Sequence, residues 1–453
     1  MAKRPKKKVL DKTRALRRTK NQPLDEMPVA GGGILDRRLV LKGGALFSAA
    51  AFTGSAAALA GEKKASSPSG AMMPPETPPW MKEPGAPFTN YGQPSPHENG
   101  VIRWISANQD VPGNGVAWTP LHNLGGTITP NGLHFERHHN GVPQIDPDAH
   151  RLMIHGLVDR PLIFTVEDLL RYPMVSKLCF LECGGNSNAG WNPEPLQARA
   201  GHLHGLVSCS EWTGVPLATL LDEAGVDRTQ GKWILAEGAD AVAVSASIPL
   251  DKAMDDVIVA LYQNGERIRP GNGYPLRLIL PGWEGILAVK WLRRIEVSNR
   301  PAMTRDETSK YTELQPDGSA RQFTFVMEPK SVILAPSPGM NLPAAGLYEI
   351  SGLAWSGNGR VRQVDVSADG GKSWTPAALS EPVLPHCFTR FRLPWKWDGG
   401  PNVLQSRTTD EMGMVQPTRK ALVGERGLNG YFHYNAIVSW EVDEFGDVSH
   451  VYV

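Results

Sequence analysis

A change of pattern near Pro301 constrains the fold of this chain more than any other feature. Between residues 101 and 300, strand-like runs alternate with helix signals, which is typical of a mixed α+β domain. From residue 301 to 453 the sequence consists of short strand-like runs and turns with almost no helical periodicity. We therefore expect an α+β domain over residues 101–300, followed by an immunoglobulin-like β-sandwich over residues 301–453.

Local signals predict several individual elements. Residues 152–158 form a strand-like run, and Thr165 with Asp168 forms a capping sequence that predicts the start of a helix. Residues 216–224 predict a second helix, which ends at Gly225. In the sandwich, residues 364–366 alternate, and residues 368–371 predict a turn that leads to a return strand carrying Trp374. This pattern predicts a β-hairpin.

The first 60 residues have the features of an export signal. They carry a net charge of +9, whereas the whole chain carries +1, so the rest of the sequence is acidic. Arg37 and Arg38 precede a mildly apolar Ala/Gly-rich segment that closes on small residues near Ala60. We predict a twin-arginine signal peptide over residues 1–60 and a proline-rich tether over residues 61–100. The mature protein would lie in the periplasm without a membrane span, and its acidic body argues against nucleic acid as a partner.

The cysteines limit the redox chemistry of the chain. Four are present, at Cys179, Cys183, Cys209 and Cys387. They are too few for a disulfide scaffold in a chain of this length, although one or two bridges remain open. No Cys-x-x-Cys-His motif occurs, so we expect no c-type haem in this chain.

Cys183 stands out because it ends a short apolar run and precedes two glycines. Gly184 and Gly185 permit backbone angles closed to other residues, and we expect the turn to let another group approach closely. A thiol in this position suits a nucleophile or a soft-metal ligand. A small buried core cysteine is an equally good interpretation of the turn alone.

Other segments supply cations and imidazoles. Residues 134–140 combine histidines with an arginine, and Arg277 and Lys290 lie on or beside short apolar runs. A buried cation is costly unless it meets an anion. With the neighbouring glycine-rich turns, these residues predict a phosphate cradle. Each signal is weak by itself, and Asp240 could simply cap a turn.

In their order and spacing, these motifs resemble the sulfite oxidase family of molybdenum enzymes. The matching motifs are Phe-x-Arg-x-His at residues 135–139, Glu-Cys-Gly-Gly-Asn at 182–186, residues 247–254, Asn-Gly at 264–265, Gly-Tyr-Pro-Leu-Arg at 273–277 and Val-Lys-Trp at 289–291. The resemblance covers roughly residues 101–453, and it implies that the β-sandwich is a dimerisation domain.

The resemblance implies a molybdenum–molybdopterin cofactor (Moco) with Cys183 as the protein thiolate on the metal. By motif position, Arg137 would supply positive potential for an anionic sulfur species, and Tyr311 would form a hydrogen bond at the reacting group. The residues predicted to bind the cofactor are Phe135, Arg137, His138, His139, Cys183, Asp240, Asn272, Arg277, Ala288, Val289 and Lys290.

The chain also departs from the family pattern. Sulfite oxidases have a histidine where Asn272 stands, a cation near Asn188 and a tryptophan near His202. A small dianion is normally clamped by more than one guanidinium, so the absence of a cation near Asn188 weakens the case for a tight free-sulfite pocket. A larger opening could admit a swinging arm.

The leader and residues 430–440 resemble the branch of this family that serves the periplasmic Sox system of thiosulfate oxidation. This resemblance implies sulfane sulfur on a cysteine of a carrier protein as substrate, and a c-type cytochrome subunit as electron acceptor. It also implies a homodimer within a heterotetramer. The alternatives are a dehydrogenase for free sulfite, a molybdenum reductase acting on sulfoxides, and an exported non-enzymatic binding or assembly protein with Cys183 in its core or in a disulfide.

Overall fold

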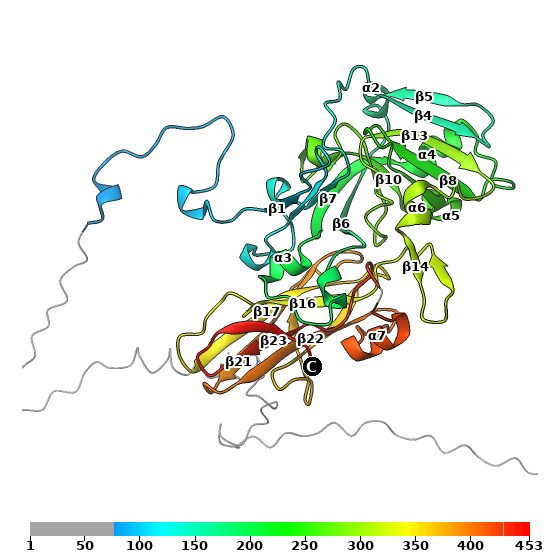
Figure 1. Ribbon diagram of the computed structural model, residues 1–453. Coiled ribbons are helices and arrows are strands. Elements are labelled where there is room, and N and C mark those ends of the chain that lie inside the picture. The colour runs from blue at the N-terminus through cyan, green and yellow to red at the C-terminus, as the bar shows by residue number, and fades with distance from the viewer. Residues whose placement is uncertain (1–76, 429) are drawn as a thin grey trace, which may run out of the picture.

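The computed structural model describes residues 77–428 and 430–453. The predicted signal peptide and the first part of the predicted tether therefore lie outside the described residues. Much of the segment of residues 77–100 runs outside the body of the protein in Figure 1, and Trp80 and Phe88 are exposed. Tyr91 nevertheless contacts the body, because its hydroxyl donates to Oε2 of Glu266 at 3.0 Å. In the described part of the chain, no helix is long and apolar enough to span a bilayer.

Three sheets build the first half of the described chain (Figure 1). The first has the order β1 (Trp104–Ala107), β2 (Gly115–Trp118) and β3 (Glu136–His138). The second has the order β11 (Glu266–Arg267), β10 (Ile258–Gln263), β7 (Val207–Pro216) and β6 (Val175–Glu182), with β12 (Arg277–Ile279) paired to β10. The third has the order β5 (Leu162–Thr165), β4 (Arg151–Gly156), β13 (Leu292–Ser298), β8 (Trp233–Gly238) and β9 (Ser245–Pro249).

Short helices accompany these sheets. They are α2 (Val166–Leu169), α3 (Ala200–His204), α4 (Leu217–Ala224) and α5 (Leu250–Asp255). Helix α2 begins with the predicted capping box. The Thr165 side chain accepts from the Asp168 N–H, and the Asp168 side chain accepts from the Thr165 N–H. Helix α4 ends at Gly225 in the left-handed conformation, which confirms the predicted stop.

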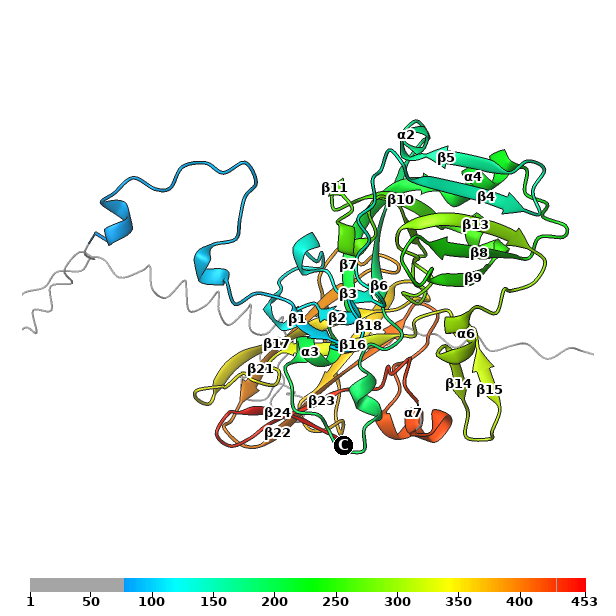
Figure 2. The same ribbon diagram turned by 45° about the horizontal axis from the view of Figure 1, so that its top comes forward.

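Two sheets packed face to face form the C-terminal sandwich (Figure 2). One has the order β16 (Lys330–Ala335), β17 (Gly346–Trp355), β21 (Thr389–Trp397) and β20 (Ala378–Leu379). The other has the order β19 (Thr375–Pro376), β18 (Val361–Ser367), β22 (Asn402–Asp410), β23 (Ser439–Val442) and β24 (Val448–Val451). Val366 pairs with Thr375, which confirms the predicted hairpin, and Trp374 directly precedes its return strand. The predicted α+β class with a sandwich is confirmed.

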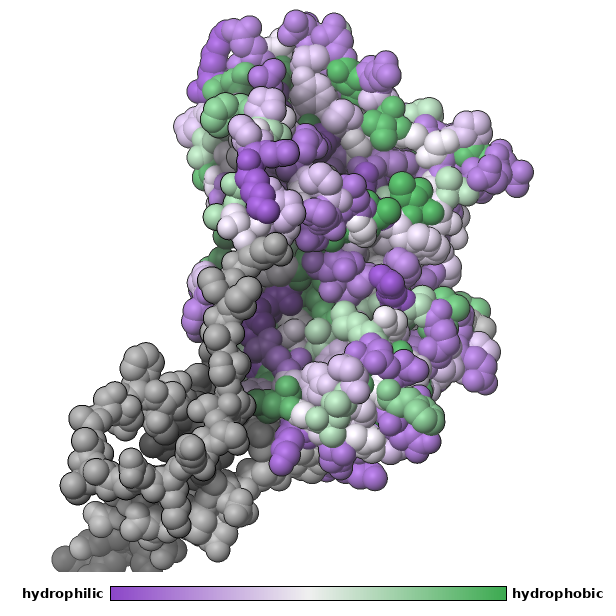
Figure 3. Space-filling view, turned by 90° about the vertical axis from the view of Figure 1, so that its left-hand side faces the viewer, coloured by the Kyte–Doolittle hydropathy of each residue, from purple (hydrophilic) through white to green (hydrophobic). Residues whose placement is uncertain are grey.

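A linking segment and a late helix lie beside the sandwich (Figure 2). These elements are α6 (Arg305–Ser309), β14 (Thr312–Leu314), β15 (Ala320–Gln322) and α7 (Arg419–Arg426). On the face drawn in Figure 3, hydrophobic residues are interspersed with hydrophilic ones, as on an ordinary globular surface.

One hydrophobic core crosses from the first half of the chain into the sandwich. Phe180 of β6 and Cys209 of β7 belong to the same buried cluster as Val332 and Trp355 of the sandwich. All four side chains are fully buried, and burial of apolar surface stabilises such contacts by about 25 cal/mol per Å². The sandwich therefore supports the β6–β7 pair, and the end of β6 leads directly to Cys183.

Candidate functional site

A cavity of about 490 Å³ lies where the predicted site segments meet. Its wall is built by β2 and β3, the turn after β6, the loops around β12 and residues 309–311 and 431–432. Each residue predicted to act in catalysis or cofactor binding lines this cavity except Asn272. Tyr431 and Phe432 also line the cavity, although they lie more than a hundred residues beyond the end of the predicted α+β domain of residues 101–300.

Cys183 reaches the cavity from the end of β6. Its backbone N–H donates to the Leu206 carbonyl at 2.9 Å, and its carbonyl accepts from the Asn186 N–H at 2.8 Å, which fixes the turn. Burial raises the pKa of the Cys183 thiol to about 11, although the Gly185 N–H lowers it in part. A bound metal ion would instead hold this sulfur as a thiolate, since a coordinating thiol is deprotonated.

Close approach is the use that the structure makes of this turn at Gly184, and neither glycine uses the positive φ angles that its residue type permits. Neither Gly184 nor Gly185 has a positive φ, whereas Ser187 does, with φ 65°. A Cβ on Gly184 would lie 1.9 Å from Oε1 of Glu284. The absence of a side chain at Gly184 therefore makes room for a buried carboxylate beneath the turn.

A buried ion pair supports the turn from the sandwich side. Nζ of Lys330 lies 3.0 Å from Oε1 of Glu182, and these side chains are 2% and 1% exposed. Nδ2 of Asn186 donates to the same oxygen at 2.8 Å, and Nε1 of Trp355 donates to Oε2 at 2.6 Å. Glu182, the residue before Cys183, is therefore bonded to side chains of two strands of the sandwich, β16 and β17.

A second pair supports the other side of the turn. Nε2 of His433 lies 3.2 Å from Oε1 of Glu284, and the backbone N–H of His433 donates to the Gly184 carbonyl at 2.8 Å. Burial opposes a charge on His433, but the adjacent Glu284 carboxylate outweighs it and raises the pKa of His433. Burial likewise raises the pKa of Glu284. The pair therefore favours retention of a proton.

Two cations, the buried Arg277 and the half-buried Lys290, face the cavity without a carboxylate partner. Arg277 donates from Nε to the Ala288 carbonyl at 3.2 Å and from NH1 to the Asn272 carbonyl at 2.9 Å. Nζ of Lys290 lies 2.9 Å from the Arg137 carbonyl. Burial lowers the pKa of Arg277 to about 9, and burial with the nearby Arg277 charge lowers that of Lys290 well below its usual value. Among the described residues, no carboxylate is within ion-pair distance of either cation, so both suit an anionic ligand.

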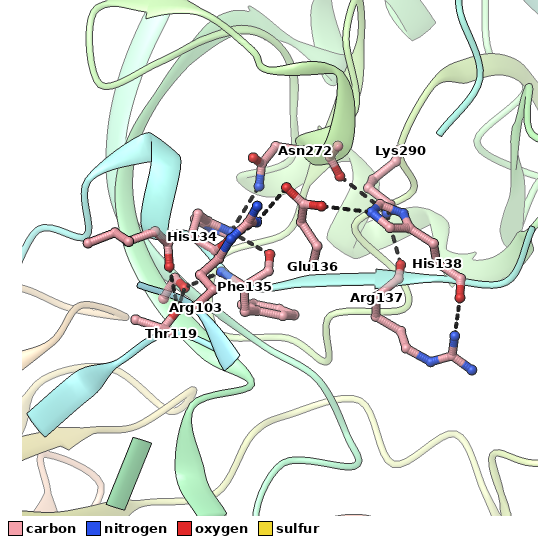
Figure 4. A network of polar contacts seen from close by, with 12 residues as sticks. Arg103, Thr119, His134, Phe135, Glu136, Arg137, His138, Asn272 and Lys290 are labelled. Atoms are coloured by element: carbon pink, nitrogen blue, oxygen red, sulfur yellow. Dashed lines mark hydrogen bonds and ion pairs between the residues drawn. The ribbon is translucent and has the colours of Figure 1, made fainter. Parts of the chain in front are cut away.

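Glu136 organises the wall beside these cations (Figure 4). Its carboxylate lies 2.6 Å from NH1 of Arg103 and 3.0 Å from Nε2 of His138. Burial opposes its ionisation, but the hydrogen bonds from His138 and Arg103 outweigh that effect and lower the pKa of Glu136 to about 2. Nδ1 of His138 in turn lies 2.8 Å from Nζ of Lys290. Glu136 occupies the first unspecified position of the Phe-x-Arg-x-His motif, and no role was predicted for it.

Asn272 lies behind the cavity wall, where it contacts His134 (Figure 4). Nδ2 of Asn272 is 3.0 Å from Nδ1 of His134, and the Asn272 side chain is 1% exposed. Burial, with a contribution from the Arg277 charge, lowers the pKa of His134 to about 3. Asn272 therefore does not line the cavity, but its backbone carbonyl accepts from NH1 of Arg277, which does; its predicted part in cofactor binding stays a prediction.

An aromatic ladder leads from the cavity to the surface. The rings of Tyr311 and Phe432 stack with centroids 4.6 Å apart, and Tyr431 meets Phe432 edge-on at 4.8 Å. Tyr431 is 61% exposed, whereas burial raises the pKa of Tyr311 well above its usual value. A hydrogen bond at the reacting group was predicted for Tyr311. No role was predicted for Tyr431 or Phe432, although both lie within residues 430–440, which carry part of the family resemblance.

The remaining wall residues suit a large anionic group whose metal ion takes one soft protein ligand. Arg137 extends its guanidinium away from the Glu136 network in Figure 4, and it bonds the His138 carbonyl. Oδ1 of Asp240 accepts from the Val244 N–H at 3.0 Å, which fixes the adjoining turn. A thiol on the cavity wall, together with two cations that have no carboxylate partner, matches a metal-bearing pterin with a phosphate.

Comparisons with known proteins agree with this donor set. Residues 139–305 match the family described as oxidoreductase molybdopterin binding domain, and residues 321–440 match the Mo-co oxidoreductase dimerisation domain. Mitochondrial sulfite oxidase of Rattus norvegicus is 33% identical over 288 residues, which are 60% of this chain and 52% of that protein. The NADH nitrate reductase of Ulva prolifera is 31% identical over 301 residues, which are 60% of this chain and 34% of that protein. The chain thus spans about half or less of these relatives.

A solved structure matches much more of the described chain. It is the sulfane dehydrogenase SoxCD from Paracoccus pantotrophus, which is 46% identical with a TM-score of 0.81. The match covers 83% of this chain and 98% of that chain. This similarity therefore extends over both the cavity and the sandwich.

Proposed function

Because the chain belongs to the sulfite oxidase family of molybdopterin oxidoreductases, we propose that it oxidises sulfane sulfur held on a cysteine of a carrier protein. Similarity to a sulfane dehydrogenase over 98% of that chain supports this substrate. The observation within the site that carries the proposal is the lining of the cavity. Neutral Asn188 lies in its wall, and the ladder of Tyr311, Phe432 and Tyr431 ends at an exposed ring.

The aromatic ladder suits a peptide arm better than a small free anion. A row of contacting rings that ends at the exposed Tyr431 offers apolar surface to an extended chain that carries a persulfide at its tip. A free dianion would instead favour a second guanidinium in the cavity wall, and Asn188 supplies no charge there. The arm would therefore gain affinity along the ladder and present only its terminal sulfur to Arg137.

When bound, the molybdenum–molybdopterin group supplies a two-electron couple and oxygen transfer to sulfur. Cys183 would hold the metal as a thiolate, and Arg277 and Lys290 would hold the anionic part of the pterin. Arg137 would orient the anionic terminal sulfur, and the Tyr311 hydroxyl would hold a proton at the reacting position. Each two-electron oxidation adds one water-derived oxygen to the sulfane sulfur and releases two protons, so that repetition gives the S-sulfonate.

The proposal includes an exported assembly. The predicted twin-arginine signal over residues 1–60 would place the protein in the periplasm, with the cofactor inserted before export. Electrons would pass to a c-type cytochrome subunit. The sandwich, which matches a dimerisation domain, would join two copies of the chain within a heterotetramer.

Steady-state kinetics with two substrates test the proposal. We expect saturation by a persulfidated carrier protein, with a c-type cytochrome as acceptor, and little turnover of free sulfite. Asn188→Arg is expected to raise kcat/KM for sulfite and lower it for the carrier, because it adds a cation to the cavity wall. Saturation of the wild type by micromolar sulfite, without any dependence on carrier, would instead establish a sulfite dehydrogenase.

A further inference from the structure

Two cysteines from different parts of the fold meet in the core that joins the two halves of the chain. Cys209 lies in β7, and Cys387 lies in the loop before β21 of the sandwich. Their Sγ atoms are 3.3 Å apart, and the residues are 0% and 4% exposed. A disulfide bond needs a separation of about 2.05 Å, so each sulfur would have to move by only a fraction of an ångström.

The backbone around both thiols is fixed by hydrogen bonds. The Cys209 N–H donates to Oγ1 of Thr129 at 3.1 Å, and the Cys209 carbonyl accepts from the Thr129 N–H at 2.7 Å. The Phe180 N–H donates to the His386 carbonyl at 2.8 Å, next to Cys387. Phe180 is also the register partner of Cys209. These backbone hydrogen bonds hold the two cysteines next to each other. A bond between their sulfurs would therefore not require either half of the chain to move.

We propose that Cys209 and Cys387 form a disulfide that fastens the cofactor-binding half of the chain to the sandwich in the exported protein. The inference rests on the export proposed above, because disulfides persist in oxidising compartments. The cross-link would fix β6 and β7 on the sandwich, and β6 carries Cys183 at its end. Cys179 is a further thiol of this region, but it belongs to a different buried cluster. It lies on the face of β6 opposite to that of Phe180, whose cluster contains Cys209 and Cys387.

The chemistry is thiol–disulfide exchange with a disulfide donor, either a small molecule or an oxidase protein. The hydrogen bond from Cys209 lowers the pKa of Cys387. In the loop, Cys387 lies two residues after the exposed Pro385. Cys387 therefore attacks one donor sulfur as the thiolate and releases the first donor thiol. Cys209 then loses its proton and attacks the Cys387 sulfur of the mixed disulfide. The second donor thiol leaves, so the protein loses two electrons and the donor gains them.

Peptide mapping of the exported holoenzyme tests the proposal directly. The protein is purified without reductant, denatured in excess N-ethylmaleimide and digested. We expect a linked peptide containing Cys209 and Cys387 in most molecules, with Cys179 recovered as the single alkylated form. Recovery of both Cys209 and Cys387 as alkylated peptides would overturn the proposal.

Two further measurements separate this inference from the proposed function. A leaderless protein kept in the cytoplasm is expected to carry both thiols reduced and to form the same link with oxidised glutathione, and failure to form it would contradict the geometric argument. Cys387→Ser is expected to lower the Tm of oxidised protein by roughly 5 °C, with no further effect of reductant, whereas Cys179→Ser keeps the response to reductant. Molybdenum content and sulfur oxidation are measured on the same samples, since their loss would leave the link unaffected.

Discussion

Replacing Lys330 with methionine tests how the sandwich supports the turn that carries Cys183. Nζ of Lys330 lies 3.0 Å from Oε1 of Glu182, and neither side chain is more than 2% exposed. Methionine retains most of the aliphatic stem but removes the cation, so Glu182 keeps only the neutral donors of Asn186 and Trp355. Breaking a buried pair while leaving one charge behind costs roughly 3–5 kcal/mol.

The loss is measured as a change in melting temperature. For a chain of this size, the entropy of unfolding converts that energy into a fall in Tm of roughly 4–6 °C. The double variant Glu182→Gln with Lys330→Met removes both charges, and we expect it to recover most of the loss. Calorimetry of the three proteins decides the question. A single variant within about 1 °C of the wild type, or a double variant as unstable as the single one, would refute the reasoning.

Three further predictions concern the same site. Gly184→Ala is expected to lower the Tm by several degrees, because the new methyl would lie 1.9 Å from a buried carboxylate oxygen. Gly185→Ala is the control, because the nearest atom to its methyl is 3.6 Å away. Equal Tm values of the two variants in calorimetry would contradict this prediction. Because burial lowers the pKa of His134 from 6.5 to about 3, its stabilising effect is complete above pH 6.5 and is lost as the pH falls. Urea unfolding is therefore expected to show about 2 kcal/mol less stability at pH 5 than at pH 7 from this group, and His134→Asn removes that loss. Lys290→Met is expected to weaken pterin retention at least ~10-fold in dialysis, whereas Lys232→Met, at an exposed lysine that does not line the cavity, leaves it within a factor of a few.

Features with local causes could be predicted from the sequence. The capping box at Thr165 and the stop at Gly225 depend on residues within one turn of the chain, and both are confirmed. The hairpin after Val366 is also set by adjacent turn residues. The site motifs fall at strand ends and loops of one fold, so their ordered spacing indicated the family, and the structure places almost all of these residues around one cavity.

Contacts between distant segments could not be predicted. Gly184 needs no special φ, because its role is to make room for Glu284, which lies about a hundred residues further along the chain. Lys330 gave no signal, because its partner Glu182 belongs to another part of the fold. Asn272 occupies a family position but contacts His134 instead of the cavity. Tertiary packing decides each of these cases, and no local pattern records it.

Metal analysis of the purified holoenzyme tests the central claim most directly. We expect about one molybdenum and one pterin per chain in the wild type and in the control variant Cys179→Ser. In Cys183→Ser, X-ray absorption at the molybdenum edge is expected to show one fewer sulfur ligand, with sulfur oxidation abolished. Well-folded wild-type protein without molybdenum or pterin, made in a host that synthesises the pterin, would contradict the account. An unchanged sulfur count with full turnover in Cys183→Ser would contradict it equally.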